Sequence, residues 1–270
     1  MELCMRRFLL QANFLFSLSL LWPLHSLADT FDFPWCVAHR GYSIDYLENS
    51  KAAIEAAIQA GADAIELDIR HSYDGVALIH HDSRLKRTSK SKEGKKCKLN
   101  APINSQNYKS IRNNCILKND EELVTLGITL QYFTHLDQVL ILEFKDSPSK
   151  KTLQILKSFQ GSSLKLIAIS FEQKVLDTLA QHELIYQDPI KLIWLTPIPV
   201  YLPDRFDGIG PFLISDGMIA HLREKQKYIN VWTVDRSSKM KSLFTRGVHM
   251  ITTNQLDTCL TVKRQLPKPA

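Results

Sequence analysis

Short apolar runs alternate along the chain with segments in which apolar residues recur at helical spacing. The apolar runs have the length and composition of buried strands. They are predicted at Trp35–His39, Ala64–Ile69, Val76–His81, Val139–Phe144, Leu164–Ile169, Leu192–Leu195, Asn230–Val234 and Met250–Thr252. Gly208–Phe212 is either a ninth short strand or a loop. Helical patterns separate most of the later runs, as at Glu172–His182 and Ser237–Thr245, which predicts an α/β protein.

The first predicted helix has clear boundaries. Asn49 or Ser50 can cap its N-terminus, residues 52–58 are rich in Ala and Ile, and Gly61 fits the left-handed position after its end. Strand–helix repeats of this kind build either an open doubly wound sheet or a closed (β/α)8 barrel. The alternation by itself allows both architectures.

Residues 84–125 interrupt the alternation. They are polar, weakly periodic and rich in Lys, Asn and Ser, which is typical of an insertion. Without this segment and the first 28 residues, roughly 200 residues remain, near the lower end of the size range of a (β/α)8 barrel.

Residues 1–28 have the pattern of a secretory signal peptide. Two arginines precede an apolar stretch whose densest part, Phe14–Leu24, has the length of a signal-peptide core and is too short to span a bilayer. Ser26–Ala28 places small residues at the two positions that a signal peptidase reads. We therefore expect an exported protein, periplasmic or secreted, with a mature domain at 29–270. An uncleaved membrane anchor is the alternative.

The composition is that of a globular protein, with 44% hydrophobic and 23% charged residues, which excludes a disordered or coiled-coil chain. The net charge of +6 suggests an acidic partner, which could be nucleic acid, a membrane surface or a phosphate-bearing substrate. Arg84–Lys98 alone holds eight Lys or Arg and one Glu, so the rest of the mature chain carries −2. This stretch is a solvated loop, a weak contact for an anionic membrane surface, or a guide for an anionic substrate.

Export would expose the cysteines to an oxidising compartment. Cys97 and Cys115 share the polar insertion, and a disulfide between them would stabilise the chain by about 3 kcal/mol. Two free thiols are the alternative. Cys36 lies in a predicted buried strand and Cys259 in the last predicted helix, so we expect two core residues there rather than a bridge. No Cys or His spacing is typical of a zinc site.

Three carboxylates lie on predicted strands. Glu66 and Asp68 are two positions apart on an otherwise apolar strand, so both side chains project from one face. Glu143 and Lys145 repeat this spacing at the end of another strand. Burying carboxylates is unfavourable unless a cation or hydrogen bonds compensate. Three converging carboxylates would favour Mg²⁺ or Ca²⁺. The alternative is that each pairs with a neighbouring Lys or Arg.

Two histidines end predicted strands. His39 ends the first strand and is followed by Arg40, and His81 ends the third. Barrel enzymes hold their active sites at the carboxyl ends of their strands, and histidine suits acid–base chemistry near neutral pH. The planar guanidinium of Arg40 could bind a phosphate. His80 must point away from His81, so we expect it to pack against the helical layer.

These residues belong to a series of motifs that spans nearly all of the mature chain. The motifs are Val37–Gly41, Glu48–Asn49, Gly61–Asp68, Asp74–Gly75, His81–Asp82, Glu143–Lys145, Ser170–Phe171, Val231–Asp235 and Gly247–Thr252. In this order they resemble the glycerophosphodiester phosphodiesterase family.

The resemblance implies a TIM (β/α)8 barrel with a small insertion after the third strand. It implies hydrolysis of a small-molecule glycerophosphodiester to an alcohol and sn-glycerol 3-phosphate, with one divalent metal ion, Ca²⁺ or Mg²⁺, as cofactor. The implied roles are acid–base catalysis by His39 and His81, metal binding by Glu66, Asp68 and Glu143, substrate binding by Arg40, Lys145 and Trp232, and support of the site by Glu48.

Four positions depart from the family's pattern. Leu47 stands where Pro is usual and Asp235 where Asn is common, while Asn254 and Leu256 replace an Asp and a Pro. None of these departures removes an implied catalytic group, so they bear on substrate detail more than on activity.

Three other functions are alternatives. A phospholipase D-type barrel that hydrolyses lysophospholipids or sphingolipids would share the two histidines and the Glu-x-Asp arrangement. A non-catalytic binding protein is disfavoured because every implied catalytic residue is present. Nucleic acid is not an expected partner, because the basic residues occur without a helix-turn-helix, RNP-like or zinc pattern.

Overall fold

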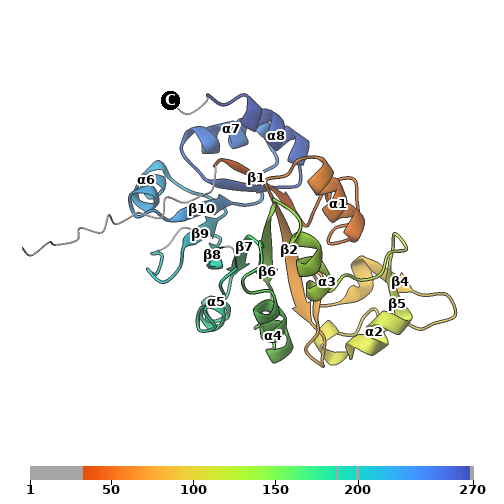
Figure 1. Cartoon of the computed structure of the whole chain (residues 1–270). Helices are drawn as coiled ribbons and strands as arrows, with labels where there is room; N and C mark the ends of the chain where they lie inside the picture. Colours follow the sequence, from red (N-terminus) through yellow and green to blue (C-terminus); the bar gives the residue numbers. More distant parts are fainter. Residues whose placement is uncertain (1–32, 187, 199–200, 268–270) are drawn as a thin grey trace, which may run out of the picture. The chain divides into compact units, whose positions relative to one another are not determined.

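The computed structural model describes residues 33–186, 188–198 and 201–267, and the predicted signal peptide at 1–28 lies outside them. Within these ranges, eight parallel strands form a barrel that closes because β1 pairs with both β2 and β11 (Figure 1). The barrel strands are β1 (Trp35–His39), β2 (Ala64–His71), β6 (Val139–Phe144), β7 (Leu166–Ser170), β8 (Lys191–Thr196), β9 (Gly208–Pro211), β10 (Tyr228–Val231) and β11 (Met250–Thr253). The expected TIM barrel is confirmed, and the open sheet is excluded.

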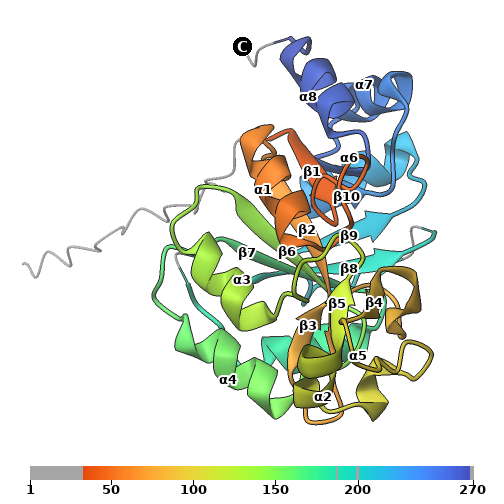
Figure 2. The ribbon, with the colours of Figure 1, turned by 90° about the vertical axis from the view of Figure 1, so that its right-hand side faces the viewer.

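Helices lie around the outside of the strands (Figures 1 and 2). They are α1 (Lys51–Gln59), α3 (Leu126–Phe133), α4 (Lys150–Ser158), α5 (Gln173–Ala180), α6 (Asp216–Glu224), α7 (Ser237–Thr245) and α8 (Leu256–Arg264). The side chain of Ser50, and not that of Asn49, caps α1 by accepting a hydrogen bond from the Ala53 N–H. None of the helices in the described ranges combines the length and the apolar character needed to cross a bilayer.

The third predicted strand has a different role from the one expected. β3 (Ala77–Ile79) is antiparallel to β2 and lies outside the closed ring, and Gly208–Pro211, which the sequence left as a strand or a loop, is a barrel strand instead. The reason is the short turn at Asp74–Gly75. A parallel neighbour needs a crossover of a dozen or more residues, so a strand that returns after a few residues must be antiparallel.

The insertion follows β3 and is an ordered subdomain. It contains η1 (Leu85–Arg87), β4 (Ser89–Ser91), η2 (Ile103–Ser105), α2 (Tyr108–Asn114) and β5 (Cys115–Leu117), with β4 and β5 paired. Its small core consists of Leu78, Leu85, Cys97, Ile103, Ile111, Cys115, Leu117 and Leu123. These apolar residues are too widely spaced to give a periodic sequence pattern. The structure joins Cys97 to Cys115 by a disulfide, the pair named from the sequence.

A second disulfide joins Cys36 in β1 to Cys259 in α8, so the expectation that these are separate core residues is wrong. Both residues are fully buried, and they are 223 positions apart in sequence. Closure of the barrel places the first strand beside the last strand–helix unit. The pairing therefore depends on a contact that sequence spacing does not reveal.

We expect the Cys36–Cys259 bond to stabilise the fold more than the Cys97–Cys115 bond. The chain-entropy relation gives about 5 kcal/mol for the loop of 223 residues and about 3 kcal/mol for the loop of 18. The measurement is the free energy of unfolding with and without reductant. It uses Cys97→Ala/Cys115→Ala, which keeps only the long bond, and Cys36→Ala/Cys259→Ala, which keeps only the short one. The prediction would be contradicted if reduction of the Cys36–Cys259 bond lowered the free energy of unfolding by the same amount as reduction of the Cys97–Cys115 bond, or by less.

Candidate active site

Strand register brings the three predicted carboxylates and one histidine to the same end of the barrel. His39 pairs with Glu66 across β1 and β2, and Asp68 pairs with Glu143 across β2 and β6. Ile65 and Leu67 belong to the apolar cluster that packs with the helices, so Glu66 and Asp68, which alternate with them, face the barrel interior.

The loop after β1 wraps around this end of β2. Gly41 has φ +80°, and a Cβ at this position would lie 2.7 Å from backbone atoms of Ala53, so the turn requires glycine. The preceding residue, Arg40, donates its backbone N–H to Glu66 at 3.0 Å. Asn49 is buried and exchanges two hydrogen bonds with Asp68, from its side-chain amide to the carboxylate and from the Asp68 N–H to its own oxygen. The loop thereby fixes the orientation of both β2 carboxylates.

The three carboxylates form one buried cluster. Glu66, Asp68 and Glu143 are 1%, 0% and 7% exposed, and each offers an oxygen within 4.8 Å of the others. Burial raises the pKa of Glu66 well above its ordinary value, and the charges of Asp68 and Glu143 raise it further. Burial also raises the pKa of Glu143, against the opposing effect of Lys145. The cluster therefore resists carrying three negative charges.

Two cations contact the cluster. Lys145 lies 3.0 Å from Asp68 and also pairs with Glu143, and Arg40 Nε lies 3.3 Å from Asp68. Burial would raise the pKa of Asp68, but Lys145 and Arg40 together hold it below its ordinary value. The alternative of individual ion pairs thus describes Asp68 and Glu143. It does not describe Glu66, whose Oε1 is buried without a hydrogen-bond partner.

This donor set fits a divalent cation. Three ionised carboxylates against Arg40 and Lys145 leave one excess negative charge, and the orphaned Glu66 oxygen is a polar atom that burial penalises. The ligand atoms are oxygens only, which suits Mg²⁺ or Ca²⁺ rather than zinc.

His39 is held at the edge of the cluster by a chain of polar contacts. Its Nδ1 lies 2.7 Å from Asn254 Oδ1, and its Nε2 lies 4.0 Å from Glu66. Asn254 in turn donates its side-chain amide and its backbone N–H to the two oxygens of Asp235, both at 2.9 Å. Burial, and then the charge of Arg40, lower the pKa of His39. The neutral ring therefore directs its Nδ1–H to Asn254 and its free Nε2 toward the carboxylates.

His81 follows β3, which runs antiparallel to the barrel strands that carry the carboxylates. β3 returns antiparallel to β2, and His80 N–H donates to Asp68 O, so the next residue lies beside the top of β2. A positive charge on His81 acts to lower the pKa of Asp68 after the larger effects of Lys145 and Arg40, and it opposes the rise that burial causes in the pKa of Glu143. Its Nδ1 lies 2.7 Å from Asp82 Oδ1. Thus both histidines border the same carboxylates, each with Nδ1 engaged by a neighbour.

Arg87 ties the insertion to the site. It donates to Asp82 through Nε at 2.7 Å, and it forms a two-pronged contact with Glu48. Glu48 also accepts from Arg40 Nη1 at 3.0 Å. The predicted supporting residue Glu48 therefore holds one arginine at the carboxylate cluster and one arginine from the insertion.

Two further sequence expectations concern aromatic rings. His80 is buried, but it contacts the Asp82 carbonyl and Thr88 Oγ1 of the insertion, so the expectation that it packs against the helical layer is wrong. Trp232 follows β10, donates its indole N–H to Gly210 O, and makes edge contacts with Phe171 and Phe212. These three rings form an aromatic group at the ends of β7, β9 and β10.

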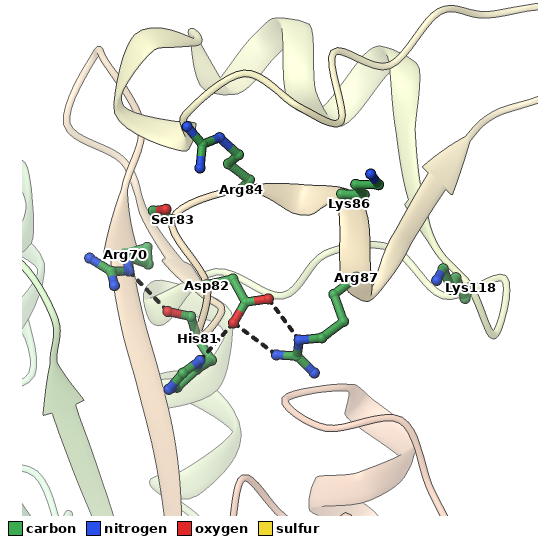
Figure 3. A pocket seen from close by; sticks show the side chains of 8 residues that line it. All are labelled: Arg70, His81, Asp82, Ser83, Arg84, Lys86, Arg87 and Lys118. Carbon is green, nitrogen blue, oxygen red and sulfur yellow. Dashed lines mark hydrogen bonds and ion pairs between the residues drawn. The ribbon is translucent and has the colours of Figure 1, made fainter.

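A pocket of about 700 Å³ opens beside His81 (Figure 3). Its lining comes from the top of β2, the segment after β3, η1 and the segment after β5. The lining residues are Arg70, His81, Asp82, Ser83, Arg84, Lys86, Arg87 and Lys118.

Five of the residues that orient the site had no such role predicted from the sequence. Asn49 was considered as a helix cap and as part of a motif, and Asp82 only as part of a motif. Asn254 and Asp235 were noted only as departures from the family's pattern, and that joint departure was the available signal. Arg87 had no signal, because seven other basic residues surround it in sequence.

Comparison with known proteins gives consistent matches. The profile of the "Glycerophosphoryl diester phosphodiesterase family" matches residues 39–146. A "Glycerophosphodiester phosphodiesterase" of Bacillus altitudinis is 26% identical over 252 residues, which cover 85% of this chain and 98% of the relative.

Solved structures share the fold. An Oleispira antarctica phosphodiesterase, solved in complex with the product sn-glycerol-3-phosphate, has a TM-score of 0.72 at 19% identity, covering 86% of this chain and 97% of its own. A glycerophosphodiester phosphodiesterase of Thermotoga maritima has a TM-score of 0.65 at 24% identity, covering 87% of this chain and all of its own. The profile match over residues 39–146, the relative and the shared barrel all support the glycerophosphoryl diester phosphodiesterase family for this chain.

Proposed function

We propose that this protein hydrolyses glycerophosphodiesters to an alcohol and sn-glycerol 3-phosphate with the help of a divalent cation. The observation that carries the proposal is the convergence of two oriented histidines on three buried carboxylates that Arg40 and Lys145 would leave one negative charge short of compensation if all three were ionised. The profile match and the substrate named for the B. altitudinis relative support the choice of phosphodiester. The same relative favours free glycerophosphodiesters over the lysophospholipids of the phospholipase D-type alternative.

Glu66, Asp68 and Glu143 would hold the cation, Mg²⁺ or Ca²⁺. When bound, the cation supplies Lewis-acid polarisation of a phosphoryl oxygen. Arg40 and Lys145 are already fixed against Asp68 and would stabilise the negative charge that grows on the phosphoryl oxygens in the transition state. Trp232, with Phe171 and Phe212, would line the apolar side of the substrate site.

His39 and His81 would move the protons. One accepts the proton of the attacking oxygen, from water or from a neighbouring hydroxyl of the substrate's glycerol, as the new P–O bond forms. The other donates a proton to the alkoxide as the P–O bond to the alcohol breaks. Asn254 and Asp82 engage Nδ1 of the two rings, which keeps Nε2 of each available to the substrate.

Export to a periplasm or beyond the cell is part of the proposal. Its support is the signal-like pattern of residues 1–28 together with two disulfides in the described chain, because disulfides persist in oxidising compartments.

The central experiment measures release of glycerol 3-phosphate from glycerophosphocholine, with lysophosphatidylcholine as the competing substrate. We expect turnover of the first, its loss with EDTA, and recovery with Mg²⁺ or Ca²⁺. His39→Ala and His81→Ala should each lower kcat by about 10²–10⁴-fold, because each removes one proton-transfer group. Both variants should keep the wild-type circular dichroism. Near-normal rates in either variant, or a preference for the lysolipid, would refute the assignment.

Glu66→Gln should make the metal-free protein more stable. The pKa of Glu66 is raised in the folded chain, so its stabilising contribution is fully present below the ordinary carboxyl pKa and is lost as pH rises through the folded value. In EDTA at pH 8 the variant should have a higher Tm than the wild type. Mg²⁺ or Ca²⁺ should raise the Tm of the wild type by roughly 5 °C and that of the variant much less. An unchanged metal response in the variant would remove Glu66 from the cation site.

Asn254 should act through His39. Asn254→Ala should lower kcat by roughly 10-fold or more with little change in KM, because His39 loses the acceptor that fixes its ring. Asn254→Asp alone places two carboxylates side by side, and Asn254→Asp/Asp235→Asn restores one acid and one amide. We expect the double variant to recover most of the activity lost by Asn254→Asp. If the double variant lost as much activity as the two single variants together, Asn254 and Asp235 would not be coupled.

A further inference from the structure

The pocket beside His81 is strongly basic and is not used by the chemistry above. Five of its eight lining residues are Lys or Arg, and Asp82 is the one acidic lining residue. Two of the cations are already compensated, since Arg70 pairs with Asp146 at 2.6 Å and Arg87 pairs with Glu48 and Asp82. The remaining charge of this pocket comes from Arg84, Lys86 and Lys118.

Among the described residues, no carboxylate forms an ion pair with Arg84, Lys86 or Lys118. This distinguishes them from other cations of the insertion, because Lys90 pairs with Asp120 and Lys92 pairs with Glu122. Three uncompensated cations around one pocket create a positive potential that attracts anions.

The scaffold behind these cations is ordered. Leu85, between Arg84 and Lys86, is fully buried in the core of the insertion, and Arg84 Nε donates to Asn100 O at 2.9 Å. The Lys118 N–H donates to Thr88 O at 2.9 Å, so the segment after β5 is bonded directly to the end of η1. The pocket wall is therefore fixed, in contrast to the solvated loop that the sequence allowed.

The pocket lies where it can receive one of the two alcohol groups that a phosphodiester substrate carries. A phosphodiester has two ester arms, and here one arm is always glycerol while the other varies in size. His81 lines the pocket, and Figure 3 shows Arg70 and His81 at one side with Lys118 at the far side. An open space of about 700 Å³ adjoining a catalytic histidine suits the variable arm.

We propose that this pocket binds the alcohol arm of the substrate and selects alcohols that carry an additional anionic group, such as a phosphate monoester. The proposal rests on the proposed function. Arg84, Lys86 and Lys118 attract the extra anion, and the alcohol then leaves beside His81, which would be the histidine that protonates it. Substrates with a cationic alcohol such as choline gain nothing from these three residues.

The test compares glycerophosphoinositol 4-phosphate with glycerophosphoinositol, which differ by one phosphate monoester. In the wild type, we expect kcat/KM to be about tenfold higher for the phosphorylated substrate, mostly through KM. Arg84→Gln/Lys86→Gln/Lys118→Gln should bring the ratio close to one and leave turnover of glycerophosphoinositol within about twofold. Lys90→Gln/Lys92→Gln/Lys95→Gln removes the same charge from the same insertion outside this pocket and should keep the wild-type ratio.

A wild-type ratio near one, or an equal drop in both triple variants, overturns the pocket assignment while the hydrolase activity stands. If no glycerophosphodiester is hydrolysed, the proposed function fails, and calorimetric titration with inositol 4-phosphate then decides the pocket. Weaker binding by the pocket variant than by the control variant supports the site, and equal binding overturns it. Binding of phosphatidylglycerol vesicles that only the pocket variant loses, with a substrate ratio near one, assigns the cations to a lipid surface and also overturns it.

Discussion

The arrangement of this protein depends on negative charge buried at the end of β2. Glu66 and Asp68 enter the barrel interior because the strand alternates, and the register with β6 adds Glu143 beside them. An isolated cluster of this kind would be strongly unfavourable. The surrounding polar groups can be understood as its compensation: Arg40 and Lys145 supply charge, while Asn49 and the Arg40 N–H supply hydrogen bonds. When all three carboxylates are ionised, this compensation is one charge short, so the donor set fits a divalent cation.

The extension of β2 beyond the barrel is what assembles the rest of the site. A strand that ended at Ile69 would close the barrel equally well, since the pairing with β6 ends there. The additional residues and the turn at Asp74–Gly75 send β3 back along β2, which delivers His81 to the carboxylates and starts the insertion at the mouth of the barrel. One hairpin thus links the cluster of carboxylates and histidines to the insertion, which borders the pocket beside His81.

The sequence predicted the parts of this arrangement that depend on local pattern. Alternation on β2 placed Glu66 and Asp68 on one face, and the position of His39 at the end of β1 placed it beside them. The sequence also named His81, but His81 reaches this face because β3 returns antiparallel along the extended β2, and not because it ends a parallel barrel strand. The sequence did not predict contacts that exist only after closure. Cys36 meets Cys259 because the first strand neighbours the last, and Asn254 meets His39 for the same reason. The role of β3 was predictable in principle, because the short turn before it rules out a parallel strand.

The contacts of Glu48 show why the insertion matters to a site built by the barrel. Glu48 lies in the loop after β1, and its carboxylate is shared between Arg40 at the cluster and Arg87 of η1. Arg87 also binds Asp82, the residue that orients His81. A shift of η1 would therefore disturb Arg40 at the carboxylate cluster and His81 together. The Cys97–Cys115 bond and the small core around Leu85 hold η1 in place. The insertion looks like a polar loop in the sequence. Its rigidity is nevertheless required for both Arg40 and His81 to keep their positions.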